Sequence, residues 1–106
     1  MKRVITLLIA FCAAAAVSFA ADAAAGKTVF DRSCKTCHGA DGTPNPNIAK
    51  MMKVEMRPLG SAEVQALSDE DMRKIITEGK GKMKPVATVT GKSVDDVIAF
   101  VRTLKK

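Results

Sequence analysis

The sequence predicts an all-α protein that forms one small domain. Apolar residues recur three and four positions apart in several segments, which is the spacing of a helix with one buried face, and no segment alternates apolar and polar residues as a half-buried strand does. The chain has 106 residues, and it contains no Trp or Tyr although 47% of its residues are hydrophobic. A chain of this length forms a single domain with a modest core.

The first twenty residues have the layout of a signal peptide, with Lys2 and Arg3 before an apolar run over residues 4–17. Small residues place the cleavage after Ala20 or Ala23, and we favour Ala20. An uncleaved membrane anchor is the weaker alternative, because the run is shorter than the about 20 residues that cross a bilayer. We therefore expect residues 1–20 to be removed and residues 21–106 to form the exported, periplasmic domain. Losing both basic residues lowers the net charge from +6 to +4.

The mature chain begins with a predicted helix over residues 23–33, where Gly26, Val29 and Phe30 lie on one face. Residues 39–49 are rich in Gly, Pro, Asn and Asp. This composition predicts a loop without regular structure. We expect this loop to wrap around another group in the folded protein.

Two further helices are predicted in the middle of the chain. Ser61 can cap a short helix that runs through Leu67, and Ser68 can cap a second helix that ends at Gly79. The inward face of the second helix carries Met72, Ile75 and Ile76.

The last predicted helix has the clearest pattern. Ser93 is the expected N-cap, and Arg102 in the last turn interacts favourably with the helix dipole. Its apolar face consists of Val97, Phe100, Val101 and Leu104.

Cys34, Cys37 and His38 form the Cys-x-x-Cys-His pattern of c-type haem attachment. The two thiols can add to the vinyl groups of the porphyrin, and the imidazole can bind the iron as proximal ligand. A redox dithiol would need a strand and a βαβ setting, which the neighbouring sequence does not show. A zinc site needs about four ligands, but the chain has one His and one further Cys, Cys12, which lies in the leader. We predict one haem c, attached by two thioether bonds.

With these residues in place, the chain resembles the class I cytochromes c over residues 22–106. The resemblance implies three to four helices wrapped around one covalently attached haem, with the N- and C-terminal helices packed through Gly26, Phe30 and Phe100. It also implies that a proline carbonyl accepts a hydrogen bond from the proximal histidine, which orients the ring. Pro44 and Pro46 are both candidates for this contact.

The ligand on the other face of the iron cannot be a second histidine of the same chain, because the chain has one His. Met83 is the predicted ligand, since it lies in a Gly- and Lys-rich stretch, residues 79–85, that resembles the ligand loop of the family. Methionine ligation raises the reduction potential. Met56 is the alternative methionine, and a lysine or an open site are the other possibilities. Many family members have proline directly after the methionine, whereas Lys84 intervenes here.

We expect a periplasmic electron carrier rather than an enzyme. The alternative is an open iron site that binds peroxide or a small gas, but no second His, Tyr or Trp is available as a distal acid, base or radical site. A basic rim should surround the haem edge and attract membrane-bound or periplasmic redox partners. This basic rim consists of Lys35, Lys80, Lys82 and Lys84. The modest charge and the lack of stacking aromatics argue against nucleic acid binding, and we expect a monomer without stable membrane insertion.

Overall fold

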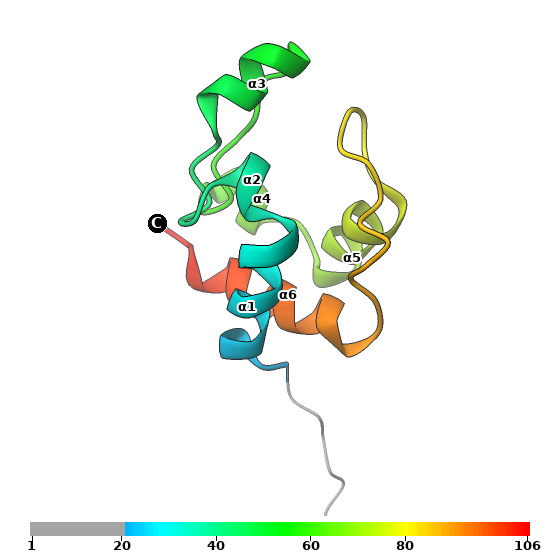
Figure 1. The fold of residues 1–106 in the computed structure, drawn as a ribbon. Coiled ribbons are helices and arrows are strands. Elements are labelled where there is room, and N and C mark those ends of the chain that lie inside the picture. Colours follow the sequence, from blue (N-terminus) through cyan, green and yellow to red (C-terminus); the bar gives the residue numbers. More distant parts are fainter. Residues whose placement is uncertain (1–20) are drawn as a thin grey trace, which may run out of the picture.

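The computed structural model describes residues 21–106, so the predicted signal peptide and Cys12 lie outside the described residues. The prediction of an all-α fold is confirmed, because this part of the chain contains helices and no strand (Figure 1). None of these helices has both the length and the apolar character that a membrane crossing requires. The helices are α1 (Ala23–Ser33), α2 (Lys35–His38), α3 (Pro46–Met52), α4 (Ala62–Gln65), α5 (Asp69–Glu78) and α6 (Lys92–Thr103).

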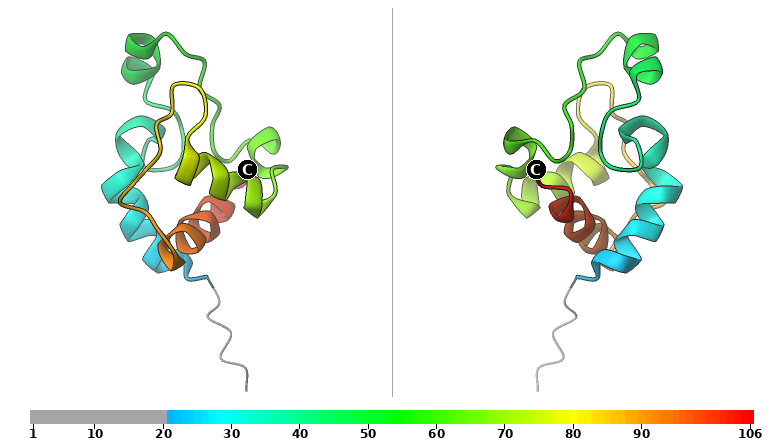
Figure 2. Two further views of the ribbon diagram at one scale, coloured as in Figure 1. Left: turned by 90° about the vertical axis from the view of Figure 1, so that its right-hand side faces the viewer. Right: turned by 90° about the vertical axis from the view of Figure 1, so that its left-hand side faces the viewer.

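The helices α1 and α6 pack against each other at one end of the molecule, while α3 extends at the other end (Figures 1 and 2). Gly26 is buried where the two helices meet, and a Cβ atom there would lie 1.8 Å from the carbonyl oxygen of Asp96. The ring centroids of Phe30 and Phe100 are 5.0 Å apart, with the ring planes tilted by 56°, a favourable aromatic arrangement. The expected contact of the first and last helices through these residues is confirmed.

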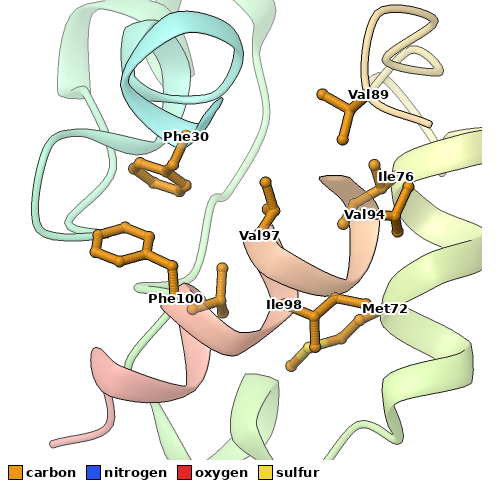
Figure 3. Packing of buried hydrophobic residues seen from close by; sticks show 9 residues of the cluster. Phe30, Met72, Ile76, Val89, Val94, Val97, Ile98 and Phe100 are labelled. Carbon is orange, nitrogen blue, oxygen red and sulfur yellow. The ribbon is translucent and has the colours of Figure 1, made fainter. Parts of the chain in front are cut away.

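The hydrophobic core lies between α1, α5 and α6. Figure 3 shows the Phe30 ring facing the Phe100 ring on one side of α6, and Met72 of α5 next to Ile98 on the other side. The helix α6 therefore forms the centre of this core and separates α1 from α5. The buried apolar side chains are Phe30, Met72, Ile76, Val89, Val94, Val97, Ile98, Phe100 and Val101.

Most of the predicted helix ends agree with the structure, and the exceptions have local causes. The helix α4 begins after Ser61 as predicted but ends at Gln65, two positions before Leu67. The helix α6 begins after Gly91, so Ser93 is not its N-cap. The backbone N–H of Ser93 donates to the carbonyl of Thr90. The first turn therefore forms earlier in the chain than the serine suggests.

Two short helices were not predicted, and they raise the number of helices above the expected three to four. The helix α2 is a single turn at the haem-attachment sequence. The helix α3 contradicts the prediction that residues 39–49 form an irregular loop. The side chain of Asn45 accepts a hydrogen bond from the N–H of Asn47, and Pro46 occupies the first helical position, where its missing N–H costs nothing. The same residue types that indicate a loop thus begin a helix here.

Candidate functional site

The predicted site residues meet in one cavity of about 750 Å³. Its wall includes Cys34, Cys37, His38 and Met83, which come from two segments more than forty residues apart. Most of the cavity surface is formed by apolar atoms, and the volume lies within the range of about 300–1,000 Å³ that is typical of ligand and cofactor pockets. The cavity is built from α2, α3, residues 54–57 and residues 80–86.

The helix α1 leads directly into the turn that carries the two thiols and the imidazole. The N–H of Cys34 donates to the carbonyl of Phe30 over 2.8 Å, and the N–H of His38 donates to the carbonyl of Cys34 over 3.0 Å. These backbone hydrogen bonds continue the helical path through α2. They place Cys34, Cys37 and His38, all half-buried, along one side of the cavity.

The environment of Cys34 argues against a reactive redox dithiol. Burial, together with the neighbouring Cys37, raises the pKa of the Cys34 thiol to about 11. The group is therefore a thiol and not a thiolate at neutral pH. A thioredoxin-type cysteine needs the opposite shift, because its thiolate is the nucleophile. Neither Cys34 nor Cys37 forms a disulfide with another described residue.

The imidazole of His38 is neutral at neutral pH, because burial lowers its pKa. The neutral ring is the form that binds a metal ion. Its Nδ1 atom is buried and has no hydrogen-bond partner among the described residues. The expected hydrogen bond to the carbonyl of Pro44 or Pro46 is therefore not formed. Pro46 is the first residue of α3, where the carbonyl group points along the helix axis.

Asn45, which sequence reasoning missed, connects the attachment turn to α3. Its N–H donates to the carbonyl of Cys37 over 3.0 Å, and its side-chain amide donates to the carbonyl of Thr36 over 3.3 Å. Its side-chain oxygen accepts from the N–H of Asn47 over 3.0 Å and so caps α3. An asparagine directly before a proline is a recognisable helix-start signal, and it could have identified this residue.

Met83 is held at the end of a short hairpin. The N–H of Lys80 donates to the carbonyl of Met83 over 2.9 Å, and the N–H of Met83 donates back over 3.0 Å. Gly81 has φ +56° at the first central position of this turn, the position of a type II′ turn that requires glycine. The N–H of Val86 donates to the carbonyl of Ile76 over 2.8 Å, which attaches the hairpin to α5. The Gly- and Lys-rich stretch over residues 79–85 thus contains a hydrogen-bonded turn.

Of the five methionines within residues 21–106, three line the cavity and two do not. Met52 and Met56 lie on its wall with Met83, so the structure brings both methionines predicted as ligand candidates to the site. Met51 is 70% exposed, and Met72 is part of the core, as its inward helical position predicted. The remaining methionine is Met1, outside the described residues.

The predicted basic rim is partly assembled at the cavity. Lys80, Lys82 and Lys84 line it and are exposed, and Arg57 joins them from the opposite segment. Lys35 is exposed on α2 but does not line the cavity. The positive charge is therefore concentrated on the hairpin that carries Met83.

The residues around the cavity fit a covalently bound haem. Two thiols, a neutral imidazole and a thioether meet in one largely apolar cavity, and the buried Nδ1 atom of the imidazole has no hydrogen-bond partner within residues 21–106. Thiols, imidazole and thioether are the groups by which proteins attach and ligate this cofactor. Within residues 21–106, no group of three or more His, Cys, Asp or Glu residues could hold a bare metal ion.

Comparisons with known proteins agree with the geometry. The family model described as Cytochrome c matches residues 23–105. The chain is 31% identical to cytochrome c6 of Rippkaea orientalis (strain PCC 8801 / RF-1) over 108 aligned positions, which cover 95% of this chain and 92% of the relative. It is 32% identical to cytochrome c-554(547) of Halothiobacillus neapolitanus, covering 81% of this chain and 100% of the relative. A solved structure, the KustC0563 c-type cytochrome, matches with a TM-score of 0.65 at 33% identity, covering 76% of this chain and 98% of that chain.

Proposed function

We propose that this chain, which belongs to the cytochrome c family, is an exported one-electron carrier with a single haem. Members of this family are electron-transfer proteins and not enzymes. The family binds haem c covalently. For this chain we assign the two thioether bonds to Cys34 and Cys37 and the axial positions to His38 and Met83. The observation that carries the assignment is the single cavity that all four residues line.

The bound haem supplies a one-electron couple, and the protein residues set its surroundings. The attachment turn fixes the imidazole of His38, and burial keeps it neutral. The hairpin presents Met83 from a different segment of the cavity wall. If His38 and Met83 both bind the iron, it would have no open position for a substrate. A thioether ligand also raises the reduction potential relative to a second nitrogen ligand.

We propose that the leader is residues 1–20 and that cleavage follows Ala20. The side chain of Asp22 accepts hydrogen bonds from the N–H groups of Ala24 and Ala25 and thus caps α1. Its N–H donates to the carboxylate of Asp96 over 2.8 Å. Cleavage after Ala23 would remove this cap and the tie to α6, whereas cleavage after Ala20 keeps both. Periplasmic secretion followed by intact-mass measurement should therefore give residues 21–106 plus one haem, even after denaturation.

We also propose that the basic rim binds acidic redox proteins of the periplasm or the membrane surface, and that the carrier itself is a monomer. The support is the exposure of Lys35, Lys80, Lys82 and Lys84 beside the attachment turn and the cavity. Electrostatic attraction of this kind speeds association and weakens with added salt. The bimolecular rate with an acidic redox protein should therefore fall as ionic strength rises, and a flat salt profile would contradict the docking proposal.

The ligation is tested by the spectrum of the ferric protein. The wild type should show the weak red charge-transfer band of sulfur-ligated iron, and Met83→Ala should abolish it. Met56→Ala is the matched control, because it removes a thioether from the same cavity. It should retain the band, since the proposed ligand Met83 is still present. Loss of the band in Met56→Ala alone would transfer the assignment to Met56. A wild-type spectrum that is high-spin, with rapid carbon monoxide binding in the ferrous state, would instead favour the open-site class.

A further inference from the structure

The side chain of Lys82 joins two walls of the cavity. Its Nζ atom donates a hydrogen bond to the carbonyl oxygen of Met52 over 2.7 Å, across thirty positions of sequence. Lys82 directly precedes Met83 in the hairpin, and Met52 is the last residue of α3. All three residues line the cavity. The contact therefore ties the hairpin with the proposed iron ligand to the helix beside it.

The end of α3 is a suitable acceptor for an ammonium group. The last carbonyl groups of a helix have no partner inside the helix, and this end carries the negative pole of the helix dipole. A lysine that reaches these carbonyls is a recognised way to satisfy them. Met52 offers such a carbonyl, and Lys82 supplies the donor.

The helix α3 has few other attachments. None of its seven residues is buried, and it makes no substantial interface with another helix of the described chain. Asn45 ties its N-terminal end to the attachment turn. The bond from Lys82 ties its C-terminal end to the hairpin. With both ends held, α3 and the hairpin can keep a fixed separation across the cavity.

We propose that Lys82 is a positioning residue for Met83, and that its hydrogen bond to α3 keeps the hairpin closed on the cavity so that the thioether stays at the iron. This inference rests on the proposed His38 and Met83 ligation. Charge alone does not explain it, because Lys84 flanks Met83 on the other side and forms no hydrogen bond or ion pair within residues 21–106. Lys84 is therefore the matched control.

The test is an imidazole titration of the haem-loaded ferric protein. Imidazole binds iron only when the thioether has left, so its apparent affinity reports the fraction of molecules with an open hairpin. Lys82→Leu should bind imidazole about tenfold more tightly than the wild type, because hydrogen bonds from charged donors are stronger than neutral ones. Lys84→Leu removes the same charge without a hydrogen bond and should stay within about twofold, by the same reasoning. Lys82→Arg retains a charged donor and should restore most of the wild-type affinity.

Met83→Ala separates the two proposals. It should bind imidazole most tightly and lack the red band. If Met83→Ala binds imidazole as the wild type does, the ligation proposal is wrong and the role of Lys82 falls with it. If Met83→Ala behaves as expected but Lys82→Leu and Lys84→Leu have equal affinities, the ligation stands and the positioning role is refuted. Lys82 is exposed, so melting curves of the variants should confirm intact folding.

Discussion

The contact between α1 and α6 makes a sharp prediction for Gly26→Ala. In an isolated helix this substitution is favourable by about 1 kcal/mol, because alanine has the higher helix propensity. In this protein, the new Cβ would lie 1.8 Å from the carbonyl oxygen of Asp96 and 2.4 Å from its carbonyl carbon. Both atoms belong to the backbone of α6, so no side-chain rotation can relieve the overlap. Helix propensity therefore predicts that Gly26→Ala stabilises the protein, whereas packing predicts that it destabilises the protein.

The magnitude follows from the displacement that the two helices need. The distance to the Asp96 oxygen must widen from 1.8 Å to at least 3.0 Å before the contact is tolerable. Overpacking of a core costs about 1–3 kcal/mol, and a backbone clash belongs at the upper end. Separating the helices also weakens the Phe30 and Phe100 contact, since aromatic pairs contribute about 0.5–1.5 kcal/mol. After the propensity gain is subtracted, we expect a loss of about 2 kcal/mol.

Thermal unfolding of the haem-loaded protein, followed by far-ultraviolet circular dichroism, measures this loss. For a domain of this size, about 2 kcal/mol corresponds to a fall in Tm of about 8–16 °C. Thr28→Ala is the matched control, because Thr28 is exposed on the same helix and its replacement changes propensity without a clash. Its Tm should equal or slightly exceed that of the wild type. If Gly26→Ala melts at or above the wild-type temperature, the close approach of α1 and α6 does not restrict the residue at position 26 to glycine.

Three further predictions concern the cofactor, acid stability and the hydrogen bonds of one half-buried arginine. The Cys34→Ala, Cys37→Ala double variant should lose most of its far-ultraviolet helical signal, because the cavity of about 750 Å³ then lacks its covalent filling, and a cooperative melt would contradict this. Hydrogen bonds, chiefly from the Asp22 N–H, lower the pKa of Asp96, so this carboxylate stabilises the fold above its usual pKa of about 3.9, and the effect is lost as pH falls through the lower folded value. Urea unfolding between pH 3 and pH 7 should show a shallower acid loss for Asp96→Asn, and equal profiles would refute the role. Arg102 donates from two nitrogens to the carbonyls of Gln65 and Leu67 at the C-terminal end of α4, each over 2.6 Å. Arg102→Lys cannot form this fork and should lower the unfolding free energy by about 1–3 kcal/mol, whereas an unchanged urea midpoint would be inconsistent with it.

Features that depend on local sequence could be predicted. The bounds of α1 and α5 follow from apolar periodicity and from capping, and the cap of α5 by Ser68 is formed by a hydrogen bond from the Asp71 N–H over 3.1 Å. The contact of Gly26 with α6 was predicted from the resemblance, since the apolar faces of both helices permitted it. The α3 helix could not be separated from a loop by composition, because Asn and Pro are common in turns as well as at helix starts.

The same distinction holds for the site. Patterns within a short stretch of sequence could be predicted, whereas hydrogen bonds between distant stretches could not. Cys34, Cys37 and His38 form a local pattern whose spacing carries its chemistry, and the structure brings them together as expected. Asn45 and Lys82 act through backbone carbonyls, over eight and thirty positions respectively. A carbonyl acceptor has no side-chain signature, so no sequence pattern identifies such partners. The prediction of a hydrogen bond from His38 to a proline carbonyl failed for the same reason. The position of that carbonyl depends on where α3 begins.

The two ends of the molecule are therefore stabilised in different ways. The end with α1, α5 and α6 contains nearly all of the buried apolar side chains, and it depends on close packing. The cavity end has half-buried site residues, a helix without a buried residue, and hydrogen bonds from Asn45 and Lys82 that hold the two ends of that helix. Substitution of Gly26 should therefore lower Tm and leave imidazole affinity nearly unchanged. Substitution of Lys82 should raise imidazole affinity and leave Tm nearly unchanged. This separation lets the ligand environment of an electron carrier vary while the helical core remains intact.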